Sequence, residues 1–472
     1  MRSPTPGATF WVLAINAVAL IAFAAAPAAE EYPLAAFGIL AFMLVQACLP
    51  ACRIRVSTPV CPANIAQGYY WVQLVLVTVL VGHFGFSQGV LPHLPSRSAL
   101  DWAIVVHVVS YLSFCVAYQC WSGAAAGEGR TRRSTPGGTA YLIVPFAVLG
   151  LAGFLLAHGG LGGFVDYLSS PVADRLRAEE ATTLQSAAGT FLKHFLGFAV
   201  VLAWSWWLGK APRRKVAIVA MTVAVVMVLL LANFNYNRGT MLGPIVALGA
   251  AFSVHVWRIP FKGVVLAGAL ALCLAFVFGW YRSTDLAIGE LSVSAVTETW
   301  RTADVVEFVQ VYASGPQMTA YLIESLEGRL YYGKTLLPSL VYPIPVLGKP
   351  FRDISGPVIF NELIYGETDT LDQVIPLAGE LYMNFHLIGV IAGSALLGCV
   401  LARMQGKFVT APNPVESYAW LMMALWTVFP GSLSVASQIY VYSFWPIYAY
   451  FAARRLWSWN AAMAAHRARR FA

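Results

Sequence analysis

The stretch VAIVAMTVAVVMVLLLANFNYNRGTMLGPIVALGAAFSVHVW, residues 216–257, decides the fold class of this chain. Its two apolar runs, 216–233 and 240–257, are each close to the roughly 20 residues that an α-helix needs to cross a bilayer. The polar segment FNYNRGTM, residues 234–241, lies at their junction. Such a turn needs residues like Asn and Gly, but it does not need the guanidinium of Arg238. The pattern indicates two membrane-spanning helices and an arginine that the turn itself does not require.

The composition of the whole chain agrees with this stretch. Of the 472 residues, 59% are hydrophobic and 11% are charged, whereas an ordinary soluble domain carries about 25% charged residues. The apolar runs are continuous rather than alternating, which argues against a transmembrane β-barrel. We therefore expect an all-α polytopic membrane protein.

Hydropathy predicts about twelve transmembrane helices. Their approximate ranges are 9–26, 33–50, 69–90, 100–121, 139–158, 190–209, 216–233, 240–257, 263–281, 384–402, 415–432 and 434–452. The first run is similar to a signal peptide, but only Arg2 precedes it and many spans follow. We interpret it as a retained first span.

The distribution of Lys and Arg predicts the orientation. With the N-terminus inside, the predicted cytoplasmic loops contain CRIRVS, EGRTRRS, KAPRRK, WRIPFK and RMQGK, and the C-terminal tail is also basic. Nearly all Asp and Glu fall on the other side. Because Lys and Arg in short cytoplasmic loops orient membrane proteins, the formal charge of +8 indicates topology and attraction to anionic lipid rather than nucleic-acid binding. Both termini are predicted to be cytoplasmic.

Two predicted extracytoplasmic segments, 159–189 and 282–383, are too long to be simple turns, and such segments usually carry function. We expect nine spans in 1–281, with the shorter extracytoplasmic segment at 159–189. A large, partly helical extracytoplasmic loop would occupy 282–383, and three spans with a basic cytoplasmic tail would occupy 384–472. No P-loop, H-E-x-x-H or D-x-D appears, and the seven cysteines form no C-x-x-C, so we expect no cofactor and no metal.

Arginines predicted on the outer side run against the orientation rule. Arg238 and Arg282 both lie at the mouth of a predicted span. Arginine binds phosphate through two parallel hydrogen bonds and keeps its charge in a poorly hydrated site. Several such arginines around one cavity would suit a lipid-linked diphosphate. Pairing with nearby acids, or snorkelling to lipid head groups, is the alternative explanation for each of them.

The segment PLAGELYMNFHLIGV, residues 376–390, contains a second group of polar residues. On a helix, Glu380 and Asn384 share one face, whereas His386 shares the face of Tyr382. A carboxylate entering the membrane beside arginines could act as a general base on a sugar hydroxyl. The alternative is that Glu380 is a salt-bridge partner that fixes the loop, and that His386 is an interfacial histidine.

Four pieces of the chain, in this order, carry a resemblance to a known family. They are NYNRGTMLG, GWYRSTD, YYGKTLLPSLVYPIPVLGKPF and AGELYMNF. With them the chain resembles the O-antigen polymerase family, which includes oligosaccharide repeat-unit polymerases. One departure is His386, which stands where a glycine would be expected after Asn-Phe.

The resemblance implies a C-type glycosyltransferase-like fold in the bacterial inner membrane, working in lipopolysaccharide or other polysaccharide biosynthesis. The enzyme would transfer undecaprenyl-diphosphate-linked glycan onto another lipid-linked repeat unit on the periplasmic side, without a metal. A polysaccharide chain-length regulator would be a protein partner. Two alternatives stay open: an O-antigen-type ligase with the same donor, and a flippase or secondary transporter. Such transporters are usually built from repeated halves, which this sequence does not show.

The resemblance also implies roles for particular residues. Matched by motif, Arg238 and Arg282 would bind the diphosphate, with Arg282 stabilising the leaving group, and Glu380 would act on the acceptor. The secondary candidates for substrate binding are Arg175, Arg177, Lys349, Tyr382 and Asn384.

Overall fold

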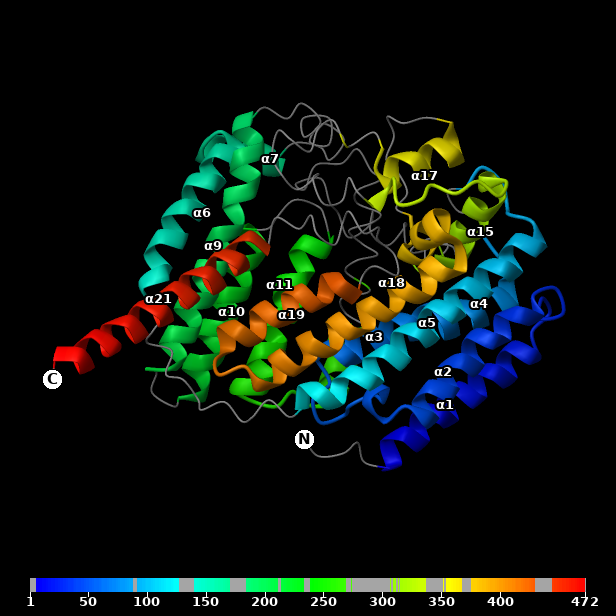
Figure 1. The fold of residues 1–472 in the computed structure, drawn as a ribbon, viewed down its shortest axis with the longest axis horizontal. Helices are drawn as coiled ribbons and strands as arrows, with labels where there is room; N and C mark the ends of the chain where they lie inside the picture. The colour runs from blue at the N-terminus through cyan, green and yellow to red at the C-terminus, as the bar shows by residue number, and fades with distance from the viewer. Residues whose placement is uncertain are drawn as a thin grey trace.

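The computed structural model describes most of the chain. The described residues are 6–87, 91–126, 140–169, 184–210, 214–232, 238–268, 315–336, 354–366, 375–428 and 444–471, with the single positions 273, 306, 309, 310, 313 and 351. Within these ranges the chain forms helices and no strand (Figure 1). The predicted all-α class is confirmed for this part of the chain.

The described residues of the N-terminal part form the α-helices α1 (Pro6–Ala24), α2 (Ala36–Cys48), α3 (Pro62–Trp71), α4 (Val77–Phe84), α5 (Arg97–Ala126), α6 (Ile143–His158), α7 (Leu161–Ser169) and α9 (Leu184–Leu208). The remaining ones are α10 (Lys215–Ala232), α11 (Arg238–His255), α15 (Gly315–Leu326), α17 (Gly356–Tyr365), α18 (Leu377–Thr410), α19 (Pro414–Val428) and α21 (Phe444–Phe471). A π-helical turn, Val72–Leu76, joins α3 to α4.

Six helices of the described part are long and apolar enough to cross a membrane. They are Pro62–Phe84, Arg97–Ser122, Ala140–His158, Ala188–Leu208, Lys215–Ala232 and Leu377–Thr410. Three shorter apolar helices, Ala8–Ala24, Pro33–Cys48 and Leu242–His255, fall on further predicted spans. The chain is thus a helical membrane protein, while the predicted total of about twelve spans stays a prediction, because most of 263–281 and 434–452 lies outside the described residues.

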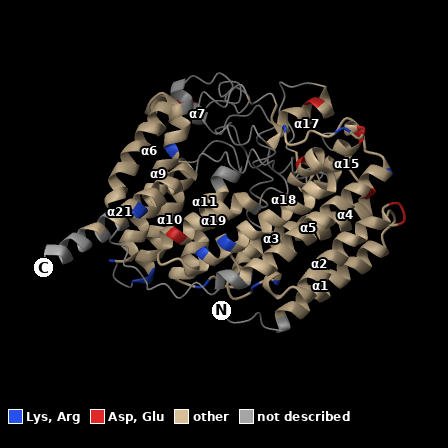
Figure 2. Ribbon diagram, viewed as in Figure 1, with Lys and Arg blue, Asp and Glu red and all other residues tan. Residues whose placement is uncertain are grey.

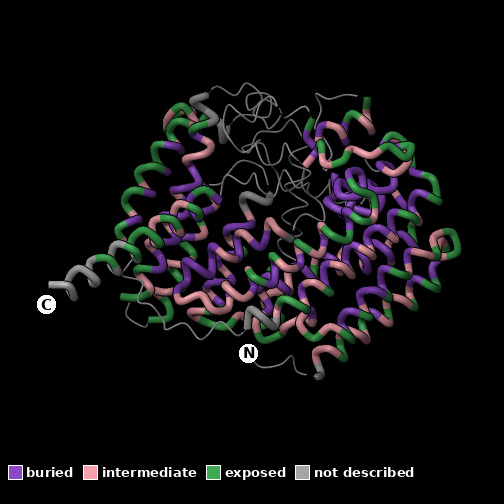
Figure 3. Tube along the Cα trace, viewed as in Figure 1, coloured by how far each residue is buried: buried purple, intermediate pink, exposed green. Residues whose placement is uncertain are grey.

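The outer helices present apolar side chains to their surroundings. Only 17% of the most apolar 18-residue stretch of α10 and 22% of that of α6 is buried, whereas 56% of the corresponding stretch of α5 is buried (Figure 3). Val144 of α6 and Val216 of α10 are 68% and 81% exposed. Because large exposed apolar faces are rare on soluble proteins, these faces are the expected contacts with lipid tails.

Two close helix pairs organise the bundle: α5 packs along α18, and α6 packs along α9. Glycines make this proximity feasible. A Cβ atom built on Gly398 of α18 would clash with the backbone of Phe114 in α5, and one on Gly150 of α6 would clash with the backbone of Leu196 in α9. Small residues at such contacts are how membrane helices approach each other closely.

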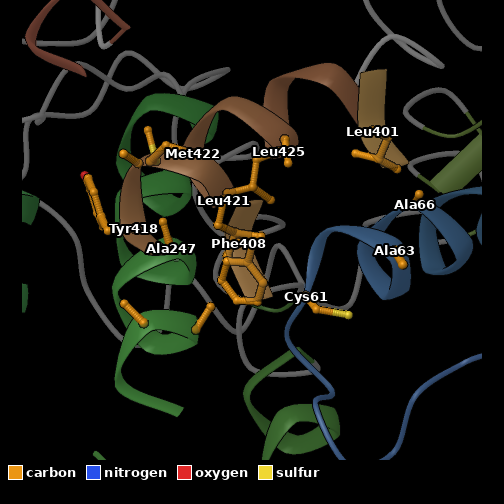
Figure 4. Close-up of a cluster of buried hydrophobic side chains, with 14 of the residues drawn as sticks. Cys61, Ala63, Ala66, Ala247, Leu401, Phe408, Tyr418, Leu421, Met422 and Leu425 are labelled. Carbon is orange, nitrogen blue, oxygen red and sulfur yellow. The ribbon is translucent and has the colours of Figure 1, made fainter. Parts of the chain in front are cut away.

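The main apolar core runs through most of the bundle, and part of it lies where α3, α11, α18 and α19 meet; there, Figure 4 shows Phe408 beneath Leu421 and Leu425. Next to it, Arg454 of α21 forms an ion pair with the buried Glu416 of α19. Asn413 caps the start of α19, since its side chain accepts the Glu416 backbone N–H at 3.0 Å and donates to the Glu416 carboxylate at 2.8 Å. These contacts attach α21 to the bundle.

Charged residues are unevenly distributed over the described structure. In Figure 2, Lys and Arg are most frequent along the lower edge, whereas Asp and Glu gather at the upper right, around α15 and α17. Both helices belong to the segment 282–383 that the sequence separates from the spans. The start of α18 lies at this same acidic end (Figure 1), next to the loop helices, and is therefore the candidate position for a functional site.

Candidate functional site

The structure describes part of the site that the sequence predicts. Glu380, Tyr382 and Asn384 lie together in the first turns of α18. Arg238 is the first residue of α11, and only its backbone is described. The remaining predicted residues, Arg175, Arg177, Arg282 and Lys349, lie outside the described residues. That these cations face Glu380 across one cavity therefore stays a prediction.

The start of α18 buries two polar side chains. Pro376 occupies the N-cap and Glu380 lies in the first turn, where a negative charge is favoured by the helix dipole. Glu380 and Asn384 are both 0% exposed. The Asn384 side chain donates a 2.8 Å hydrogen bond to the backbone carbonyl of Glu380. This contact runs along the shared helix face that the four-residue spacing predicts.

Helix α18 is broken directly after Asn384. Phe385 has φ −142° and ψ 19°, and His386 has φ 55° and ψ −152°, so neither is helical. No proline causes this break. The φ of His386 is one that favours glycine, so a residue with a side chain holds a strained backbone at the break.

The segment 331–335 binds to the broken turn. The backbone N–H of Tyr332 donates to the Asn384 carbonyl at 3.2 Å, which satisfies a group that the break releases. The Gly333 N–H donates to the Asn384 side-chain oxygen at 2.8 Å, and the Asn384 amide donates to the hydroxyl of Thr335 at 2.6 Å. Asn384 therefore joins α18 to the large loop, a structural role that its sequence position alone does not reveal.

The Glu380 carboxylate lies against the start of α17. A Cβ atom built on Gly356, the first residue of α17, would clash with Glu380 Oε1. Ser355, the N-cap of α17, is buried beside it. A helix N-terminus carries partial positive charge and favours an adjacent carboxylate. The start of α17 therefore packs directly against the buried Glu380 carboxylate.

Helix α15 completes the enclosure. The Thr319 hydroxyl oxygen of α15 lies 2.9 Å from His107 Nε2 in α5. The same side chain lies next to Gly379 of α18. The Tyr321 hydroxyl donates a 3.4 Å hydrogen bond to the Ile364 carbonyl in α17. Burial and, secondarily, the charge of Glu324 raise the pKa of Tyr321, which keeps this donor protonated. The two loop helices are thus attached to each other and to the start of α18.

A chain of three ring side chains lies on the opposite side of α18. Trp102 Nε1 of α5 donates to the Tyr382 hydroxyl at 2.8 Å, and that hydroxyl lies 2.8 Å from His386 Nε2. The rings of Tyr382 and His386 are 4.4 Å apart. Tyr382 and His386 are thus in contact, although the helix on which they were predicted to share a face is broken at Phe385 and His386. Trp102 was not predicted, because its partner is 280 positions away in the sequence.

No protein-family model matches the chain, and no curated protein or solved structure is significantly similar to it. Among the described residues, no group of three or more His, Cys, Asp or Glu side chains is placed to hold a metal ion. The site is therefore interpreted from its own geometry: a buried carboxylate–amide pair, two covering helices and an exposed imidazole at a helix break.

Proposed function

We propose that the protein is a bacterial inner-membrane glycosyltransferase that polymerises lipid-linked repeat units on the periplasmic side. It would use undecaprenyl-diphosphate-linked glycan as donor and a second lipid-linked repeat unit as acceptor, without a metal. The proposal includes about twelve spans, a C-type glycosyltransferase-like fold and two cytoplasmic termini. A chain-length regulator is the proposed protein partner.

One observation carries the proposal: the fully buried Glu380–Asn384 pair in the first turns of α18, against the start of the loop helix α17. Ionisable groups buried in membrane helices are costly and generally mark function. The start of α18, which contains the pair, lies near α15 and α17 at the acidic end of the bundle (Figure 2), which the positive-inside rule assigns to the extracytoplasmic side. Lipid-linked saccharides would meet the protein at this depth.

The proposed chemistry is a displacement at the anomeric carbon of the donor. The acceptor hydroxyl attacks this carbon, Glu380 accepts the hydroxyl proton, and the bond to the diphosphate oxygen breaks with its electron pair. Arg282 stabilises the charge that develops on the leaving undecaprenyl diphosphate, and Arg238 binds the same diphosphate, with Arg175, Arg177 and Lys349 around it. Asn384 holds the Glu380 turn, and Tyr382 belongs to the acceptor side.

The test uses purified full-length protein in liposomes. It receives a polyprenyl-diphosphate-linked repeat unit with a chelator and no nucleotide sugar, and the products are separated by size. We expect a ladder of products, which collapses in Arg282→Lys because a point charge does not replace the bidentate guanidinium. Transfer only to a different added acceptor would favour the ligase. Lipid flipping without transfer would favour the transporter, and either result would contradict the proposal.

A further inference from the structure

The helix break places a strained histidine at the surface. His386 is exposed, and its φ of 55° is rare for a residue with a side chain. Strained backbone persists only where the surroundings enforce it, and it gathers at functional sites. A glycine would fit this backbone without strain, so the imidazole is kept against the local preference of the chain.

The hydrogen-bond chain holds the imidazole of His386 and leaves its Nδ1 edge for a ligand. The Trp102 indole N–H can only donate, so it occupies a lone pair of the Tyr382 hydroxyl. The same hydroxyl lies 2.8 Å from His386 Nε2. With the hydroxyl as donor in this contact, the neutral imidazole carries its own proton on Nδ1. Tyr382 and Trp102 thereby hold the ring in position.

Apolar ring surface surrounds this donor. Phe385 and Trp102 are 42% and 36% exposed, and the Trp102 ring centroid lies 6.4 Å from that of His386. Residues 387–410 after the break rise about 36 Å, which is enough to cross the roughly 30 Å hydrocarbon core. The helical segment after the break is therefore long enough to cross a bilayer, and the break itself lies against the loop segment 331–335.

We propose that His386 is a saccharide-binding residue. Its Nδ1–H would donate a hydrogen bond to a hydroxyl or ring oxygen of the acceptor glycan. The aromatic faces of Trp102 and Phe385 would contact the C–H groups of the sugar ring, to which an aromatic face is attractive. A few placed polar groups in an apolar surround are typical of small-molecule sites. The inference rests on the proposed function for the nature of the glycan and adds the residue that recognises its sugar.

The key variant is His386→Gly, which removes the imidazole and suits the backbone. Its matched control is Glu327→Gly, because Glu327 has a similar φ of 47° and an exposed side chain that forms an ion pair with the exposed Arg329. His386→Asn restores an N–H donor near the position of Nδ1. Thermal unfolding of each full-length variant reports whether the fold is kept.

The probe is free oligosaccharide, released by mild acid from the lipid-linked oligosaccharide of the source cells, and binding is measured by titration calorimetry. This probe lacks the diphosphate, so the arginines do not contribute. We expect at least tenfold weaker binding by His386→Gly at an unchanged or higher unfolding midpoint, partial recovery in His386→Asn, and wild-type affinity in Glu327→Gly.

Two results would overturn the inference: no saccharide binding by the wild type, or equal affinity in His386→Gly. The liposome assay separates this outcome from failure of the proposed function. If His386→Gly polymerises with the same KM for the acceptor as the wild type, the role of His386 is refuted but the polymerase is not. Saccharide binding that depends on His386, without any polymerisation, would refute the polymerase alone.

Discussion

At the scale of single residues, Glu380 combines a charge with complete burial. A buried carboxylate is costly unless its surroundings compensate it, and here the first turn of α18 and the start of α17 both face it. Such an arrangement holds the carboxylate in one orientation. A fixed carboxylate could act as a general base or could anchor the loop. Replacing Glu380 by a neutral side chain of the same size should affect these two roles differently.

Glu380→Gln separates these roles. The amide keeps the size of the side chain but cannot accept a proton from the acceptor. If Glu380 is the base, polymerisation in liposomes should fall by about 10²-fold or more, with an unchanged unfolding midpoint. A parallel fall in stability and activity would assign Glu380 to anchoring, and full activity would remove it from the mechanism.

Gly356 is the residue whose side chain must be absent for α17 to cover Glu380. An added methyl group would overlap the carboxylate, so Gly356→Ala should displace α17 or Glu380 and lower polymerisation strongly. Limited proteolysis of the loop should also become faster. Gly68→Ala is the control, because a Cβ atom there meets nothing within 4 Å. Equal behaviour of the two variants would refute the role of Gly356.

The sequence predicts part of this site because part of it is local. The four-residue spacing places Glu380 and Asn384 on one face before any tertiary contact is known. Asn384 also binds Thr335, which is 49 positions away, and Trp102 reaches Tyr382 from another helix. These pairings depend on how helices pack, and a single sequence does not contain that information.

At the scale of elements, hydropathy predicts the apolar part of each span better than the helix itself. The prediction of 69–90 misses the first turns of a helix that runs over Pro62–Phe84. Those turns contain Gln67, which is buried but hydrogen-bonded to Gln46 and Tyr111. Similarly, α18 begins at Leu377 rather than near 384, because its polar first turns pack inside the protein rather than in lipid.

Helix contacts should depend on their glycines. Gly398→Ala and Gly150→Ala introduce a methyl group where backbone already lies, and overpacking of this kind costs roughly 1–3 kcal/mol. We expect both variants to unfold at lower temperature in detergent. Gly249→Ala in α11, with no atom within 4 Å of the added Cβ, should unfold like the wild type. Unchanged unfolding of all three would mean that the helix pairs are packed less closely than described.

At the scale of the whole molecule, the charged residues and the exposed apolar faces are arranged along one axis of the bundle. Basic residues gather at one end and acidic residues at the other (Figure 2), while the helices between them expose apolar side chains. The orientation can be predicted from the sequence because it depends on the Lys and Arg content of short loops and not on tertiary contacts. The proposed function requires that the end with α15, α17 and the start of α18 faces the periplasm.

Cysteine labelling in whole cells tests this orientation. Lys334 follows α15 and is exposed at the acidic end, whereas Arg403 is exposed near the end of α18. In a background without the exposed Cys48, Cys120 and Cys273, Lys334→Cys should react with a membrane-impermeant maleimide once the outer membrane is permeabilised. Arg403→Cys should react only after the inner membrane is opened. The reverse pattern would place Glu380 and His386 at the cytoplasmic side, where a periplasmic polymerase could not use them.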